Sequence, residues 1–298
     1  MAANDTIREV VLAVAERLKA AGIEESRLEA ELLASAVLGV TRSVLRLDPD
    51  RPVSAGAARA FVPLLERRVH HEPLQYILGE AAFRELVLHV DRRVLIPRPE
   101  TEQLVGAVLA WWSGRGRGGA ALDVGTGSGA IALSLARESD IRPIVATDVS
   151  ADALAVAGAN AMRLGLTDRV ELREGSLLAP LRPDERFAVI VSNPPYIAPA
   201  QRDTLAPEVR DWEPGEALFA GDHGFAVLYA LVDAALPWLE PGGLLAVEVG
   251  AAQARAVRRR AEGAGYVHVR LLPDLAGHER FVFAERDDRG RGSERNET

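Results

Sequence analysis

The fold of this chain is decided by the stretch Ala121-Leu122-Asp123-Val124-Gly125-Thr126-Gly127-Ser128-Gly129. A short apolar run that meets a glycine turn and then a helical pattern predicts a strand leading into a helix. Glycines in such a turn adopt positive φ and let a ligand approach the backbone closely. The spacing differs from the G-x-G-x-x-G of dinucleotide-binding folds. The stretch by itself therefore leaves two interpretations open, a tight turn and a ligand cradle.

Strand and helix patterns alternate on both sides of this stretch. Strands are predicted at 120–124, 143–147, 169–173, 187–192, 244–249, 266–271 and 279–283. Helices are predicted at 100–112, 129–138, 151–164, 224–238 and 251–263. Such alternation is typical of βαβ units, so we expect an α/β fold with a mainly parallel sheet and helices on both faces.

The N-terminal part has a different pattern. Apolar residues recur at helical spacing from Ile7 to Leu18, from Glu24 to Leu38, and from Ser54, a candidate N-cap, to Val69. We therefore predict a small helical domain at 1–80, a hairpin linker at 81–96 and the α/β domain at 97–285. The charged tail at 286–298 lacks apolar residues and is predicted to be disordered.

Composition excludes several classes of function. The 298 residues are 48% hydrophobic and 26% charged, which is typical of a globular chain with a real core. Cysteine is absent, which excludes disulfides and thiolate metal sites and fits a cytoplasmic location. His70 and His71 are adjacent, a spacing that does not suit two metal ligands on one helix face, so no metal site is expected. No signal peptide or membrane span is predicted, and the net charge of −8 argues against stable nucleic-acid binding.

Asp148 follows the second predicted strand of the α/β part, about twenty residues after the glycine turn. An acid at that position can accept hydrogen bonds from both hydroxyls of a ribose. The alternative is that Asp148 is only the N-cap of the 151–164 helix. The turn lacks the Lys-Ser/Thr of a triphosphate-binding loop, which argues against a nucleoside triphosphate.

The third signal is Asn193-Pro194-Pro195-Tyr196, directly after the apolar strand 187–192. Proline has no N–H to donate to a sheet, so the strand must end there, and its end is rigid. A plain alternative is a proline-terminated strand with an asparagine turn.

In this order, the three segments resemble those of class I S-adenosylmethionine-dependent methyltransferases. The resemblance implies that the loop Gly125, Thr126, Gly127, Ser128 and Gly129 passes under the methionine part of the cofactor and that Asp148 holds its ribose. It also implies that Asp123 lies near the amino end of the cofactor and that Asn193 borders it. Leu177, in Glu174-Gly175-Ser176-Leu177, falls where the family contacts adenine, here through backbone or apolar contact.

The four residues 193–196 suit an acceptor that is an amide or amino nitrogen. Such a nitrogen is a poor nucleophile because its lone pair is delocalised, so alignment with the methyl group matters more than a strong base. The side-chain oxygen of Asn193 can accept one N–H and the carbonyl of Pro194 the other. Pro195 stiffens the loop, and Tyr196 can cover the flat face of the acceptor.

Two further segments narrow the acceptor. Val94-Leu95-Ile96-Pro97-Arg98-Pro99-Glu100-Thr101-Glu102 and His71-Glu72-Pro73-Leu74-Gln75-Tyr76-Ile77-Leu78-Gly79 closely resemble the peptide chain release factor glutamine methyltransferases, the HemK/PrmC family. The resemblance covers roughly 5–285, including the closing segment Asp274-Leu275-Ala276-Gly277-His278-Glu279-Arg280. It implies a Rossmann-like domain with seven strands, the last antiparallel. It also implies N5-methylation of the glutamine in the Gly-Gly-Gln motif of release factors 1 and 2, which the helical domain would grip.

Other interpretations remain open at this point. The chain could methylate a glutamine of a ribosomal protein or an amino group of a nucleic acid, or it could be a non-catalytic adaptor. Arg98 and Glu100 could pair and cap the 100–112 helix, or they could shape a substrate pocket. Glu208, Arg210 and Glu213 lie after Tyr196, where a substrate lid could form, although solvated or structural roles are the alternative.

Overall fold

The computed structural model describes residues 5–116 and 118–288 and divides the chain into two compact units. The first unit comprises Met1–Glu80 together with Ala206–Trp212, and the second comprises Ala81–Leu205 and Glu213–Thr298. Most of the predicted disordered tail, residues 289–298, lies outside the described residues. No helix among the described residues is both long and apolar enough to cross a lipid bilayer.

The first unit is helical. Its helices are α1 (Ile7–Ala20), α2 (Ser26–Leu38), α3 (Arg42–Leu47), α4 (Ala55–Val69), α5 (Leu74–Leu78) and α9 (Pro207–Arg210). Ser54 caps α4 by accepting a hydrogen bond from the backbone N–H of Ala57, as predicted, and Gly39 ends α2 in the left-handed conformation. The short helix α3 was not predicted from the sequence. It begins at the N-cap Thr41 and spans only six residues, too few for a clear apolar period.

The segment that contains α9 belongs to this unit through a buried cation. Arg68 is 5% exposed and donates to Glu29 at 2.5 Å and to Glu208 at 3.0 Å, and Nδ1 of His71 lies 2.9 Å from the same Glu208 oxygen. A buried guanidinium needs opposite charge around it, because an unpaired one would be costly. Glu208 therefore has a structural partner, which favours the structural interpretation over a freely moving lid residue.

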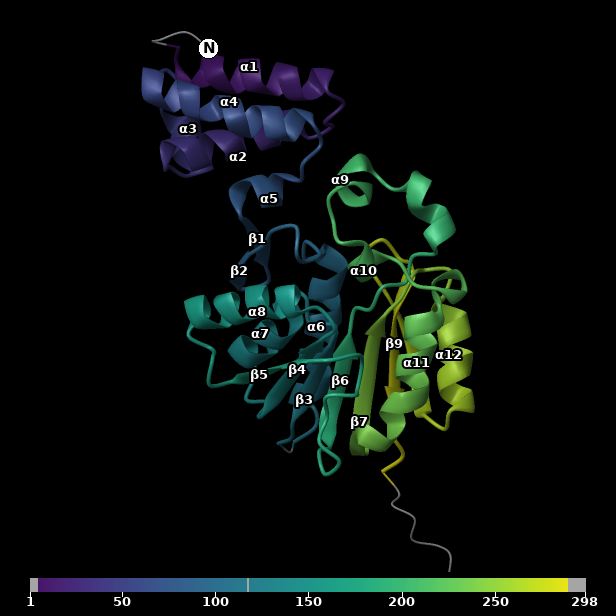
Figure 1. Cartoon of the computed structure of the whole chain (residues 1–298). Helices are drawn as coiled ribbons and strands as arrows, with labels where there is room; N and C mark the ends of the chain where they lie inside the picture. The colour runs from purple at the N-terminus through teal and green to yellow at the C-terminus, as the bar shows by residue number, and fades with distance from the viewer. Residues whose placement is uncertain (1–4, 117, 289–298) are drawn as a thin grey trace, which may run out of the picture. The chain divides into compact units, whose positions relative to one another are not determined.

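The second unit is built on a seven-stranded sheet of order β5-β4-β3-β6-β7-β9-β8 (Figure 1). The strands are β3 (Ala121–Val124), β4 (Ile144–Asp148), β5 (Val170–Glu174), β6 (Phe187–Ser192), β7 (Leu239–Glu248), β8 (Val267–Pro273) and β9 (Glu279–Glu285). All seven predicted strands are present, and β9 alone runs antiparallel to its neighbours, as expected for this fold. A separate two-stranded sheet is formed by β1 (Glu80–Phe83) and β2 (Leu86–His89).

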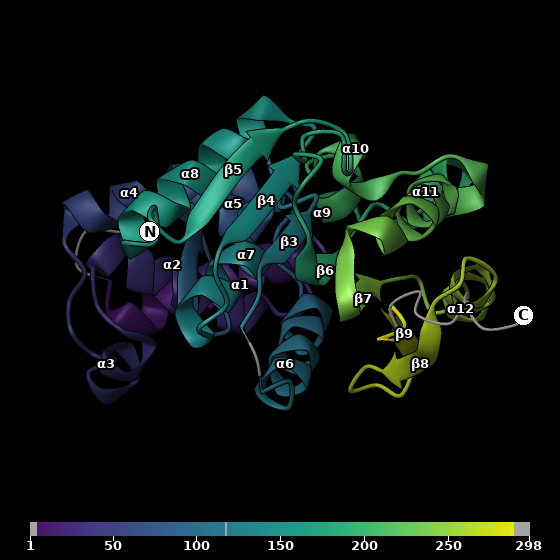
Figure 2. The same ribbon diagram turned by 90° about the horizontal axis from the view of Figure 1, so that it is seen from below.

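Helices cover both faces of the large sheet. Those of this unit are α6 (Pro99–Ser113), α7 (Ala130–Glu138), α8 (Ala151–Leu164), α10 (Gly215–Leu218), α11 (Ala226–Ala235) and α12 (Ala254–Gly263), with short 3-10 turns at Pro199–Thr204, Asp222–Gly224 and Leu236–Trp238. Figure 2 shows α6, α7 and α8 on one side and α11 and α12 on the other. Two buried apolar clusters follow this division, one with Leu104, Leu133 and Ala161, the other with Leu231 and Val257.

The register of the parallel strands places their carboxyl ends in one row. Thr147 of β4 pairs with Val124 of β3, Val124 pairs with Ser192 of β6, and Ser192 pairs with Val247 of β7. The residue that follows each of these four is Asp148, Gly125, Asn193 or Glu248. Four segments that are distant in the sequence therefore begin side by side at one edge of the sheet.

A buried asparagine ties the small hairpin to this edge. Asn160 of α8 is fully buried, and its carboxamide accepts from the N–H of His89 at 2.7 Å and donates to the carbonyls of His89 at 3.0 Å and Ser128 at 2.9 Å. One side chain thus holds the end of β2 and the glycine turn together.

Replacing Asn160 with alanine should lower the free energy of unfolding by about 3 kcal/mol, because three backbone groups lose a partner in a buried place. Urea unfolding followed by circular dichroism measures this. The matched control is Met162→Ala on the same helix, where the side chain is 74% exposed and the change should stay within about 0.5 kcal/mol. Equal effects of the two substitutions would contradict the role of Asn160.

Candidate active site

A cavity of about 530 Å³ opens at the carboxyl ends of β3, β4 and β6. Of the residues predicted for the site, it is lined by Gly125, Thr126, Gly127, Ser128, Asp148, Leu177, Asn193, Pro194 and Pro195. Asp123, Gly129 and Tyr196 are not among its lining residues. The sheet edge where a parallel strand order changes direction is the usual ligand position in this class of fold, and the cavity lies there.

The glycine turn leaves room for a ligand against its backbone. Gly125 and Gly127 have φ of 74° and 55°, a region that favours glycine, and a Cβ on either would meet nothing within 4 Å. The turn is fixed from below, because the N–H groups of Gly125 and Thr126 donate to the carbonyl of Thr147 at 2.8 and 3.0 Å. The result is a rigid turn with an open upper surface.

Asp148 supports the same turn from the neighbouring strand. Its Oδ2 accepts from the N–H of Gly127 at 2.9 Å, and its Oδ1 accepts from the N–H of Ser150 at 3.0 Å. The N-cap of α8 is Ser150, which accepts from the N–H of Ala153, so the interpretation of Asp148 as that N-cap is wrong. Each carboxylate oxygen can still accept a further hydrogen bond from a ligand in the cavity.

Asp123 is fully buried beneath the turn. Its Oδ2 accepts from the hydroxyl of Thr126 at 2.7 Å and from the N–H of Ala132 at 3.1 Å, whereas its Oδ1 has no partner among the described residues. Burial raises the pKa of Asp123 to about 7, and the nearby Asp148 carboxylate adds to this. A buried acceptor without a donor favours a bound group that supplies one, above all a cation.

Asn193, at the end of β6, also lines the cavity. Its Nδ2 donates to Oγ1 of Thr101 at 2.9 Å, and the Thr101 hydroxyl donates to Oε2 of Glu248 at 2.7 Å. No bond of the described chain occupies Oδ1 of Asn193. The ring of Tyr196 is partly buried against the apolar cluster beneath α11 and α12, and its hydroxyl points to Oε1 of Glu248 at 3.4 Å.

Arg98 does not form the ion pair with Glu100 that was one of the two interpretations of these residues. Arg98 donates to Glu213 at 2.6 Å and not to Glu100. Glu213 is buried, and burial raises its pKa, while the charge of Arg98 opposes that rise.

Leu177 has a φ of 50°, and its carbonyl accepts from the hydroxyl of Thr147, so a strained backbone is held at the cavity wall.

Thr101, Glu248, Asn160 and Val149 were not predicted individually from the sequence. Val149 lines the cavity next to Asp148 and is 63% exposed. Glu248 carried a usable signal, since an acid at the end of the apolar run 244–247 resembles Asp123 and Asp148 in their strands. Its partners lie more than fifty residues away along the chain, so the contacts themselves could not be predicted.

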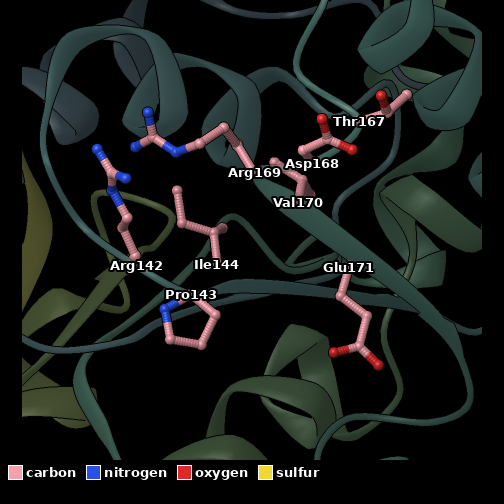
Figure 3. A pocket seen from close by; sticks show the side chains of 8 residues that line it. All are labelled: Arg142, Pro143, Ile144, Thr167, Asp168, Arg169, Val170 and Glu171. Carbon is pink, nitrogen blue, oxygen red and sulfur yellow. The ribbon is translucent and has the colours of Figure 1, made fainter.

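A second cavity, of about 600 Å³, lies at the amino ends of β4 and β5, opposite the first. Figure 3 shows the guanidinium groups of Arg142 and Arg169 on one side of it and Glu171 on another. No residue predicted for the site lines it. Its polar surface groups do not converge on one point, so the cavity beside Asn193 is the candidate active site.

The chain matches the family models described as the PrmC N-terminal domain, over residues 9–79, and the methyltransferase small domain, over residues 107–209. It is 41% identical to the release factor glutamine methyltransferase of Caulobacter vibrioides, over 91% of this chain and 93% of that protein. The chain belongs to the release factor glutamine methyltransferase family.

Other relatives extend the same finding. The release factor glutamine methyltransferase of Cereibacter sphaeroides is 42% identical over 95% of this chain and 98% of that protein. A solved methyltransferase of Pyrococcus furiosus aligns with a TM-score of 0.51 at 20% identity, over 69% of this chain and 91% of that one. This structural likeness supports the Rossmann-like fold of the α/β part.

The raised pKa of Asp123 predicts a dependence of stability on pH. The folded protein keeps a proton on this carboxyl up to about pH 7, while the unfolded chain releases it near pH 4, so the stability of the ligand-free protein should fall as pH rises between these values. Asp123→Asn cannot ionise. From about pH 5 to about pH 8 it should lose less stability than the wild type, by up to about 3 kcal/mol. Urea unfolding at both pH values measures this, and parallel behaviour of the two proteins would contradict it.

Proposed function

We propose that this chain transfers the methyl group of S-adenosylmethionine to the side-chain amide nitrogen, N5, of the glutamine in the Gly-Gly-Gln motif of class 1 release factors 1 and 2. The observation that carries the proposal is the meeting, at one cavity, of the glycine turn with Asp148 and of Asn193 with Pro194. The first pair suits a nucleoside donor and the second an amide acceptor. The family to which the chain belongs is named for this modification.

The described residues fit S-adenosylmethionine. Oδ1 of Asp123 is buried without a partner among the described residues, and the ammonium group of a methionine moiety would supply the missing donor. The open surface over Gly125 and Gly127 leaves space for that moiety, and both oxygens of Asp148 can accept from ribose hydroxyls. Val149 and Leu177 offer apolar surface to an adenine ring. When bound, the cofactor supplies a methyl group already activated by the sulfonium.

The chain's own task is to aim the acceptor. A carboxamide nitrogen is a weak nucleophile, and holding its N–H groups turns its lone pair in one direction. Oδ1 of Asn193 is free to accept one N–H, and the carbonyl of Pro194 can accept the other. Both oxygens also stabilise the positive charge that develops on nitrogen during transfer. Pro195 restricts the loop, so little reorganisation accompanies the reaction.

We infer that the helical unit recognises the release factor and that Arg98 and Glu213 shape the entrance for the glutamine. The family model that covers residues 9–79 supports the first point, and the 2.6 Å ion pair beside the cavity supports the second. The net charge of −8 favours a protein substrate over stable nucleic-acid binding.

Label transfer tests the proposed function. The protein is incubated with methyl-labelled S-adenosylmethionine and unmodified release factor 1 or 2, and the label is mapped by mass spectrometry. We expect one methyl group on the Gly-Gly-Gln glutamine and none on a release factor in which that glutamine is alanine. Transfer to a ribosomal protein or to RNA, with the release factors unlabelled, would reject the proposal.

Asn193→Ala should lower kcat by about 100-fold, the scale of losing one group that stabilises developing charge in the transition state. Binding of S-adenosylhomocysteine, measured by calorimetry, should stay within about twofold of the wild type, because Asn193 is assigned mainly to the acceptor. An unchanged kcat would remove the amide of Asn193 from the mechanism.

Asp148→Ala should weaken binding of the methyl donor. The loss of a charged acceptor for two ribose hydroxyls should weaken S-adenosylhomocysteine binding by about 10- to 100-fold. Calorimetry measures this directly. A variant that binds normally but turns over slowly would contradict the assignment of Asp148 to the ribose.

A further inference from the structure

The carboxamide of Asn193 has two possible orientations, and only one of them suits the proposed function. With Oδ1 toward the cavity it can accept an N–H from the acceptor amide. With Nδ2 toward the cavity it can only donate, and it would compete for the lone pair that has to attack the methyl group. Something in the protein must select the first orientation.

The selection can be traced through hydrogen bonds that start at the cavity wall. Thr101, 5% exposed, has a single hydroxyl proton and donates it to Oε2 of Glu248 at 2.7 Å. Its oxygen can then only accept from Asn193, and it does so from Nδ2 at 2.9 Å. The remaining oxygen of Asn193 is therefore left for the cavity.

We propose that Thr101, Glu248 and Tyr196 form a positioning relay, in which an ionised Glu248 fixes the direction of the Thr101 hydroxyl and thereby turns the Asn193 oxygen toward the acceptor amide. The proposal rests on the proposed function and adds three residues that act through Asn193.

The relay can be reversed by one proton. If Glu248 is protonated, its carboxyl can donate to the oxygen of Thr101, which frees the Thr101 hydroxyl to donate to the oxygen of Asn193. The carboxamide then turns over and presents its NH₂ group to the cavity. Every hydrogen bond within the relay is kept in this second arrangement, so both arrangements are accessible and the charge on Glu248 decides between them.

The surroundings of Glu248 hold its ionisation near neutrality. It is 1% exposed at the end of β7, and burial raises its pKa to about 7. Within this net value, the charge of Glu100 on α6 also raises the pKa, while hydrogen bonds from Thr101 and Tyr196 and the positive charge of Arg280 on β9 lower it. Arg280 is itself held by Asp274 at 2.7 Å, in the closing segment that the family resemblance singled out.

Three variants separate this relay from a merely structural role. Thr101→Val removes the hydroxyl at nearly constant volume, Thr101→Ser keeps it, and Glu248→Gln removes the charge. The control is Thr167→Val at the opposite end of the sheet, an exposed position outside the active site. Each protein is assayed with release factor and labelled S-adenosylmethionine, and S-adenosylhomocysteine binding is measured alongside.

We expect Thr101→Val to lower kcat by about 30-fold, with S-adenosylhomocysteine binding within about twofold of the wild type, and Thr101→Ser to recover most of the loss. The kcat of the wild type should fall as pH drops through about 7, and Glu248→Gln should be slow and lack this dependence. Thr101→Val with wild-type kcat, or Glu248→Gln with the wild-type pH profile, would overturn the relay. An inactive wild type would instead reject the proposed function.

A spectroscopic measurement on the free protein makes the test independent of turnover. The chain has four asparagines, so selective ¹⁵N-asparagine labelling gives few side-chain signals, and Asn193→Asp identifies the one required. The Nδ2 signal of Asn193 should shift with a midpoint near pH 7 in the wild type and stay constant in Glu248→Gln. A signal that does not respond to pH in the wild type would overturn the proposed reversal.

Discussion

The arrangement of the site depends on one constraint, the parallel register that aligns Thr147, Val124, Ser192 and Val247 across the sheet. Because the strands are paired without offset at this row, the next residue of each strand emerges in the same layer. That layer contains Asp148, the start of the glycine turn, Asn193 and the buried Glu248. A slip of one residue in any strand would turn its side chains to the opposite face and separate these groups.

Much of this was predictable because it is encoded locally. The strand 187–192 and the helix 151–164 were predicted with the bounds that the structure has, since an apolar run stopped by prolines and a helix ended by Gly165 need no distant information. The strand β7 begins five residues before its predicted start. Pro241, Gly242 and Gly243 are residue types that are rare inside strands, but pairing with β6 through a bulge carries the strand across them.

What could not be predicted is pairing between residues far apart in the sequence. Thr101 and Glu248 are separated by 147 positions, and Arg98 and Glu213 by 115. The local sequence can mark an acid at the end of an apolar run, as at Glu248, but it does not identify the residue that this acid contacts. The same limit applies to Tyr196: its hydroxyl points to the buried carboxylate of Glu248 and its ring packs against the apolar cluster on that face of the sheet, and neither contact is visible in the local sequence.

The ion pair between Arg68 and Glu208 has a consequence for dissecting this protein. The chain crosses between its two units not once but three times, because seven residues leave the methyltransferase fold after Leu205 and re-enter it at Glu213. A truncated catalytic fragment made by deleting the helical N-terminus would expose Glu208 without its arginine, next in sequence to segments that border the reaction centre. Loss of activity in such a fragment could therefore result from the broken Arg68–Glu208 ion pair as readily as from lost substrate recognition.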